Sequence, residues 1–141
     1  MIIRDVEYDK IFMGSINYGT DLLEELENIC VEKGIQLGHI EALGAVQKAC
    51  IGYYDQKSRE YGYNTLENPH EILTLSGNVS IKDEKPMVHA HIVLADGKGR
   101  ACGGHLAAGT VVFACEFLIY SFKGKVLKRG FDEKTDLSLW K

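Results

Sequence analysis

Three histidines in the second half of the chain have a spacing that could hold a metal ion. His89 and His91 are two residues apart in an apolar segment, and on a strand such residues place their side chains on one face. The turn signal at 96–99 (DGKG) then predicts a hairpin, which returns through Cys102–His105 and brings a third imidazole near the first two. Three imidazoles on rigid strands suit Zn²⁺, or another divalent ion, and leave a fourth position for water or a substrate.

One carboxylate lies in the otherwise apolar segment Thr110–Tyr120, at Glu116. Burial of a carboxylate is costly unless it is paired, hydrogen-bonded or bound to a metal. Glu116 is therefore a candidate fourth ligand, an acceptor for the N–H of a metal-bound imidazole, or a general base. Cys102 is a further candidate ligand if its side chain points to the face that carries the histidines.

The same residues also have a plainer interpretation. Two histidines two residues apart are common on sheet surfaces, Gly103 and Gly104 could serve only a bulge, and Glu116 could pair with a Lys or Arg. The spacing by itself leaves a metal site and an ordinary strand surface open. His39 and His70, in loop-like surroundings, are interpreted as surface residues.

A helix and several strands are expected to position these side chains. The segment 10–16 is typical of a strand, and a helix is expected over about 21–33, with Thr20 as its N-cap and Gly34 as its left-handed end. Further strands are expected at Gly38–Asp55, with bends or bulges at Gly44 and Gly52, and at Glu71–Ile81, with a kink at Gly77. Met87–Ala95 and Arg100–Leu106 are expected to form a hairpin, and Thr110–Phe122 a long strand. The segment Tyr61–Pro69 is interpreted as a polar loop. One α/β (α+β) domain over residues 1–141, with a mainly antiparallel sheet flanked by one main helix, accounts for this pattern.

Composition and charge restrict the class of protein. The chain has 141 residues, of which 45% are hydrophobic and 26% charged, with a net charge of −4. This excludes a disordered chain, and no apolar run approaches the roughly 20 residues that a membrane span needs. The basic run Lys123–Arg129 is interpreted as a solvated patch rather than a nucleic-acid surface. Four cysteines without a paired framework, and a start without an apolar leader, predict reduced thiols in the cytoplasm.

The strand Val111–Ile119 is apolar on both of its faces. A domain of this size with one main helix has little to cover a second sheet face, so a neighbouring subunit is the natural cover. The alternative is that the helix and the C-terminal segment cover this face within one chain.

Beyond these patterns, a series of segments resembles the prokaryotic members of the PPC family, also called DUF296, a domain that plants fuse to AT-hook motifs. The matching segments are Gly34-Ile35, Gly38, Gly44–Val46, Tyr53–Asp55, Glu71–Gly77, His89–His91, Gly103–Leu106 and Thr110–Ile119. The resemblance implies a mainly antiparallel α/β domain that assembles as a homotrimer, with a metal on the residues matched by His89, His91 and His105. It also implies a DNA-binding label, but the chain has no Arg-Gly-Arg-Pro core for the minor groove.

The triad is also similar, more distantly, to that of acetolactate decarboxylase, whose zinc is held by an HxH pair and a later His. This similarity supports an enzyme as a second hypothesis, although Arg100 is the only arginine expected beside the triad as a clamp for a substrate carboxylate. The leading hypothesis is a metal-binding, trimeric interaction or regulatory module that binds a protein partner or a small molecule. The alternatives are a zinc-dependent lyase or hydrolase that acts on a small oxygenated substrate, and a DNA-binding protein.

Overall fold

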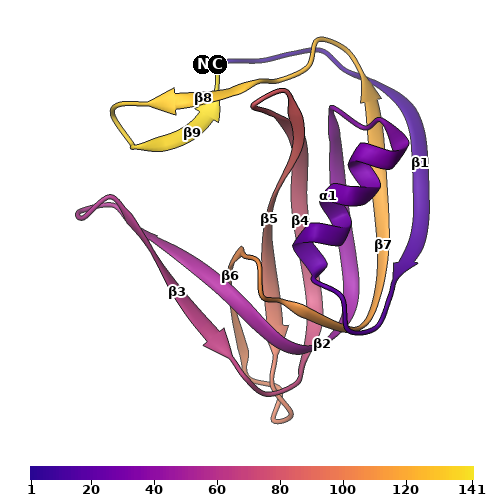
Figure 1. Cartoon of the computed structure of the whole chain (residues 1–141), viewed down its shortest axis with the longest axis vertical. Coiled ribbons are helices and arrows are strands. Elements are labelled where there is room, and N and C mark those ends of the chain that lie inside the picture. The colour runs from indigo at the N-terminus through magenta and orange to yellow at the C-terminus, as the bar shows by residue number, and fades with distance from the viewer.

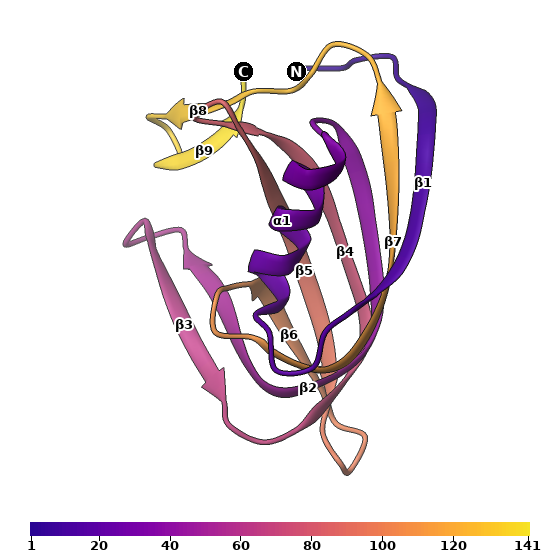
Figure 2. The same cartoon turned by 45° about the vertical axis from the view of Figure 1, so that its right-hand side comes forward.

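A long, strongly curved antiparallel sheet forms the molecule, and one helix packs against it (Figures 1 and 2). The computed structural model describes residues 1–141. Its elements are β1 (Glu7–Ile16), α1 (Leu22–Lys33), β2 (Gly38–Asp55), β3 (Glu60–Leu66), β4 (His70–Lys82), β5 (Lys85–Ala95), β6 (Ala101–Leu106), β7 (Val111–Lys123), β8 (Arg129–Asp132) and β9 (Leu137–Trp140). The predicted fold class is confirmed.

The sheet curls because β2 is long and pairs with different strands along its length. The strand order is β1-β7-β2-β4-β5-β6, and the second half of β2 pairs with β3 instead of β4 and β7. At its far end β6 pairs with β2 at Ile51↔Leu106 and Gly52↔His105. The path β2-β4-β5-β6 therefore returns to β2, and residues of β6 come close to the tyrosine-rich strand β3.

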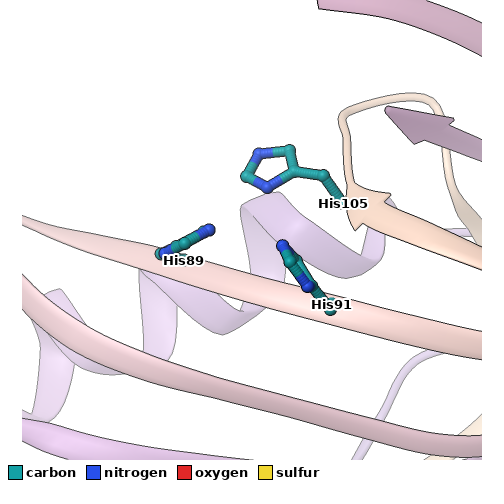
Figure 3. Close-up of side chains that lie close together, drawn as sticks. All are labelled: His89, His91 and His105. Atoms are coloured by element: carbon teal, nitrogen blue, oxygen red, sulfur yellow. The ribbon is translucent and has the colours of Figure 1, made fainter. Parts of the chain in front are cut away.

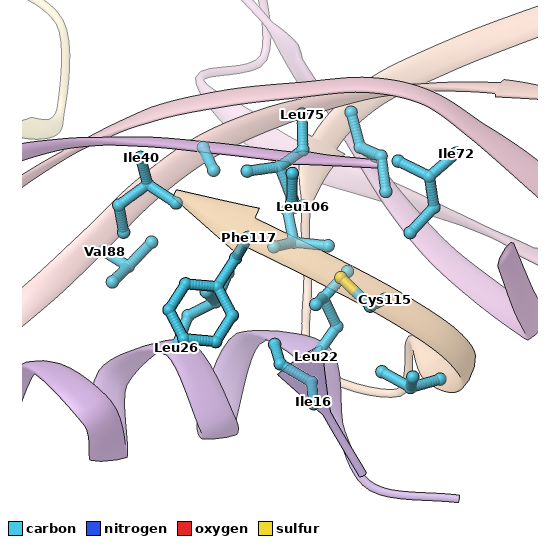
Figure 4. Packing of buried hydrophobic residues seen from close by; sticks show 14 of the residues in the cluster. Ile16, Leu22, Leu26, Ile40, Ile72, Leu75, Val88, Leu106, Cys115 and Phe117 are labelled. Atoms are coloured by element: carbon cyan, nitrogen blue, oxygen red, sulfur yellow. The ribbon is translucent and has the colours of Figure 1, made fainter. Parts of the chain in front are cut away.

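The core lies between the sheet and α1 (Figure 4). On the helix, Leu22, Leu26 and Cys30 are fully buried, and burying each leucine contributes roughly 1.5–3 kcal/mol to stability. Gly34 ends the helix in the left-handed conformation at φ 67°, as predicted. The N-cap, however, is Asp21 rather than Thr20.

The helix begins one residue later than the sequence suggests because the two polar side chains have different partners. The Thr20 hydroxyl donates back to the carbonyl of Asn17 at 2.8 Å. The Asp21 carboxylate accepts from the Glu24 amide at 3.1 Å and from the Gly109 amide at 2.6 Å. Asp21 thereby joins the start of α1 to the loop before β7.

Two details of the predicted strands are wrong. Tyr61–Pro69 is not a loop, since most of it forms β3, in which Tyr61 and Tyr63 lie opposite Tyr54 and Gly52 of β2. In β4 the irregularity lies between Ile72 and Thr74, and the register continues unbroken through Gly77. The bulge predicted at Gly44 is confirmed: its φ is 142° and the β2–β4 register shifts there.

The C-terminal segment forms a hairpin, β8–β9, which the sequence did not predict. A hydrogen bond from the Ile81 amide to the Leu127 carbonyl, at 2.9 Å, joins it to the end of β4. Its turn meets the β2–β3 turn through the Tyr54 hydroxyl, which donates to the Thr135 carbonyl, and through an Arg59–Asp136 ion pair. In both views the two chain termini lie at the same end of the molecule.

The sheet face turned away from α1, here called the outer face, is partly uncovered. Several large apolar side chains on it are more than half exposed, among them Met13, Leu43, Leu73 and Phe113. A groove of about 550 Å³ runs between the first three, with Glu41 and Glu116 along it. Neither α1 nor β8–β9 covers these residues, so the outer face keeps the apolar surface that the strand Val111–Ile119 predicted. No helix has the length and apolar character required to cross a bilayer.

Candidate metal centre

The three histidines converge on the outer face (Figure 3). His89 and His91 stand two residues apart on β5, and the β5–β6 register places His105 directly opposite His91. One ring nitrogen from each residue lies within 4.8 Å of the other two. The alternation of the strand, with Val88, Ala90 and Ile92 in the core, produces this convergence, as the spacing predicted.

Glycines let β6 approach closely enough to bring His105 into place. A Cβ at Gly103 would lie 2.4 Å from the carbonyl oxygen of Ile92, and one at Gly104 would lie 2.7 Å from that of Gly52. Real side chains do not tolerate such distances, so larger residues would push β6 away from β5 and β2. The β5–β6 register has no bulge, and the glycine pair therefore serves close strand packing.

The surroundings of His89 and His105 favour the neutral imidazole, which is the form that binds a metal ion. Burial, with smaller contributions from Arg129 and the other two histidines, lowers the pKa of His89 to about 4. Burial also lowers the pKa of His105, helped by His91 and Arg129. Metals bind the neutral imidazole, so both residues are in the binding form at neutral pH without first losing a proton.

An unpartnered nitrogen marks the same place. The Nδ1 atom of His105 is buried and has no hydrogen-bond partner in the protein, and buried polar atoms almost always have one. Around one Zn²⁺ with bonds of about 2.1 Å, ligand nitrogens would lie about 3.4 Å apart, so the rings need to close by little more than about 1 Å. The residues present therefore fit a divalent ion.

The other predicted ligands lie elsewhere. Glu116 is on β7, separated from β5 by β2 and β4, which is about 14 Å at the usual strand spacing. Glu116 is exposed, so the expectation that its carboxylate is buried is wrong. Within one chain Glu116 does not join the triad. Cys102 packs against the core, on the face opposite the histidines.

Two further histidines, His39 and His70, lie in β2 and β4 rather than in loops, and both are partly exposed. His39 lies 3.3 Å from Glu41 and stacks near Tyr120. The ring of His70 contacts the carbonyl of Asn68 at 2.7 Å. Neither belongs to the triad.

An arginine and a tyrosine that the sequence did not indicate flank the triad. The ring of Tyr61, from β3, lies 5.2 Å from the ring of His105, centroid to centroid. Arg129, the first residue of β8, donates to the side chain of Asn78 at 3.0 Å, and Asn78 lies directly opposite His89 in the β4–β5 register. Arg129 is thus half-buried beside the triad and not part of a solvated patch, whereas Arg100 is held by Asp96 at 2.7 Å in the β5–β6 turn.

The low pKa of His89 predicts how stability changes with acidity. Between its ordinary pKa of 6.5 and about 4, the unfolded chain binds a proton at His89 and the folded chain does not. The free energy of unfolding of the metal-free protein should therefore fall as the pH drops through this window, and level off below it. We expect about 1–2 kcal/mol from this residue, after allowing for its partial exposure.

Urea unfolding of metal-free protein at several pH values from 7 to 4 measures this dependence. The variant His89→Gln should flatten the decline, because glutamine does not titrate. An equally steep decline in that variant would contradict the assignment to His89.

Fold and site together define a class of protein: a one-helix, mainly antiparallel domain with a histidine triad on its outer sheet face. Residues 4–123 match the model of the Plants and Prokaryotes Conserved (PCC) domain, and the chain belongs to this family. The resemblance noted from the sequence is thereby confirmed.

Solved structures agree with this assignment. A metal-containing protein from Archaeoglobus fulgidus is 46% identical, with a TM-score of 0.95 and 99% of each chain covered. A plant- and prokaryote-conserved (PPC) protein from Pyrococcus horikoshii is 31% identical, with a TM-score of 0.94, 100% of this chain and 97% of that one covered. A protein from Bacteroides thetaiotaomicron described as a "putative dna binding protein" is 25% identical, with a TM-score of 0.86 and 96% of each chain covered.

A longer protein contains a related segment. The bifunctional protein GlmU of a Synechococcus strain is 32% identical over 105 residues, which are 74% of this chain and 15% of that protein. The chain thus spans only a small part of that relative's length.

Proposed function

We propose that this protein is a single-domain, cytoplasmic, metal-binding member of the PCC family that works as a trimeric interaction or regulatory module. The observation that supports metal binding best is the set of three convergent imidazoles, one of them with a buried and unpartnered Nδ1. The metal-containing relative from A. fulgidus supports the same proposal. Zn²⁺ is the ion that an all-imidazole set suits best.

Metal analysis of protein purified without a histidine tag or chelator tests this function. One divalent ion per chain is expected, and protein without stoichiometric metal would contradict the proposal. Loading of metal-free protein with Zn²⁺ and Co²⁺ in parallel shows which of the two ions the site retains.

A second candidate function is a zinc-dependent lyase or hydrolase acting on a small oxygenated substrate. Three protein ligands leave a coordination position for an oxygen, which a bound Zn²⁺ polarises. The observation in favour is that Tyr61 and Arg129 flank the triad, where they could contact such a ligand.

The trimer is proposed from the uncovered outer face. Exposed apolar patches of this kind on a soluble domain mark interaction surfaces. The patch around Leu43 and Met13 lies on β2 and β1, which are two and four strands from β5 in the sheet order.

Duplex DNA should not bind with useful affinity, although structural relatives bear a DNA-binding description. Basic proteins bind non-specific DNA with dissociation constants of about 10⁻⁴–10⁻⁶ M by neutralising phosphates. This chain has a net charge of −4, and a trimer multiplies that charge. Six cations are already paired with carboxylates: Lys33, Arg59, Arg100, Lys123, Lys128 and Lys141.

An anisotropy titration with mixed-sequence duplex at about 150 mM salt measures this affinity. The expected dissociation constant is weaker than the range for basic proteins. Salt-sensitive binding tighter than micromolar would show that the trimer presents a basic surface, and would favour a DNA-binding function.

A further inference from the structure

Arg129 is a half-buried cation without an anionic partner. Its Nε donates to the Ser80 hydroxyl at 2.8 Å, and its two terminal nitrogens donate to the Ser138 carbonyl at 3.1 Å and to the Asn78 side-chain oxygen at 3.0 Å. All three acceptors are neutral, and Arg129 takes part in none of the ion pairs of the chain. A cation withdrawn from water is usually paired with a carboxylate or bound to a ligand.

Neighbouring carboxylates are engaged with other cations. On the β8–β9 hairpin, Asp132 pairs with Lys141 at 2.9 Å and Asp136 pairs with Arg59 at 3.2 Å. No acidic side chain joins the cluster of His89, His91 and His105. The charge of Arg129 is therefore not balanced by the residues around it.

The guanidinium is held in a fixed place beside the triad. Three hydrogen bonds and the ring of Trp140, whose centroid lies 5.8 Å from the Arg129 Cζ atom, fix its orientation. A guanidinium has five N–H donors, so two remain for another acceptor. Asn78 lies directly opposite His89 and on the same sheet face in the β4–β5 register, which places the guanidinium next to the triad.

We propose that Arg129 makes this site selective for a small oxyanion, a carboxylate or a phosphate, bound between the guanidinium and the triad. This inference rests on the proposed metal site. Three neutral imidazoles leave the full positive charge of a divalent ion uncompensated, and Arg129 adds another positive charge. An oxyanion neutralises both, and the planar fork of arginine matches its oxygens.

Ligand titrations of Co²⁺-loaded protein, followed by visible absorption at constant ionic strength, test this selectivity. Acetate and acetamide form a matched pair, because they have nearly the same shape and only acetate is charged; inorganic phosphate is the third probe. The variant Arg129→Gln should weaken acetate or phosphate binding at least about tenfold and leave acetamide unchanged. Tighter binding of phosphate than of acetate would identify phosphate as the preferred oxyanion.

Two control variants separate charge recognition from general effects. Arg129→Lys keeps the charge and loses the fork, so its oxyanion affinity should lie between those of the wild type and Arg129→Gln. Arg100→Gln removes an arginine that Asp96 already neutralises, and should change no affinity. Equal affinities of wild type and Arg129→Gln for both acetate and phosphate would overturn the inference.

If Arg129→Gln disturbs the β8–β9 hairpin, a measurement on the wild-type protein still tests the inference. The Arg129 Nε–H resonance of ¹⁵N-labelled, Zn²⁺-loaded protein should shift with added acetate or phosphate and saturate at the concentration found by absorption. If neither ion shifts this resonance although the protein contains stoichiometric metal, the inference is overturned and the proposed metal binding is not. Failure of the wild type to bind metal would instead overturn the proposed function and this inference with it.

Discussion

Replacing His91 by alanine should remove the metal from the untagged protein and leave the fold largely intact. The ring of His91 is close to those of His89 and His105, at 5.3 and 5.7 Å between centroids. Two remaining imidazoles do not form a stable Zn²⁺ site, because such sites use at least three protein ligands. The side chain is exposed on the outer face, so its truncation opens no core cavity and should cost little stability.

Metal stoichiometry and thermal unfolding of the two proteins, measured side by side, check this expectation. His70→Ala is the matched control, since His70 is also on the sheet and its ring contacts the carbonyl of Asn68 rather than the triad. The control should retain one ion per chain. Stoichiometric metal in the His91→Ala protein would place the ion elsewhere.

The second large effect concerns assembly: wild-type protein should have the mass of a trimer, and Leu43→Asp should reduce it to a monomer. Three chains of 15.7 kDa give about 47 kDa. Leu43 is 56% exposed and lies opposite Glu116 in the β2–β7 register. An aspartate there would place two like charges together in an apolar contact, where neither could be solvated.

Light scattering at micromolar concentration gives both masses directly. Val31→Asp is the control, because Val31 is 60% exposed on the solvent side of α1, away from the outer face. It should remain a trimer. A monomer mass for the wild type would contradict the proposed assembly, and an unchanged mass for Leu43→Asp would exclude this face from the interface.

The parts of the site that follow local rules could be predicted from the sequence. His89 and His91 share a face because strand side chains alternate, and His105 meets them because a tight turn fixes the register of the hairpin. These inferences need only neighbouring residues and regular geometry. The helix end at Gly34 and the bulge at Gly44 are of the same kind.

Features that depend on distant contacts were missed. Tyr61 lies in a polar stretch whose pairing with β2 is decided by the curvature of the whole sheet, so a loop was the reasonable expectation. Arg129 is bonded to residues 49 and 51 positions earlier in the chain, and a four-residue strand in a basic run gives no local signal. Glu116 was misplaced because alternation identifies a face of a strand but not how many strands separate two residues on that face.

The β8–β9 hairpin lies outside the part of the chain that defines the family, which ends at residue 123. The histidines are inside that shared part, whereas Arg129 is delivered by the hairpin beyond it. If Arg129 selects the ligand as proposed, affinity for the metal and preference for a ligand are encoded in separate stretches of this sequence. A change in the C-terminal hairpin alone would then alter which molecules the site accepts without disturbing the metal ligands.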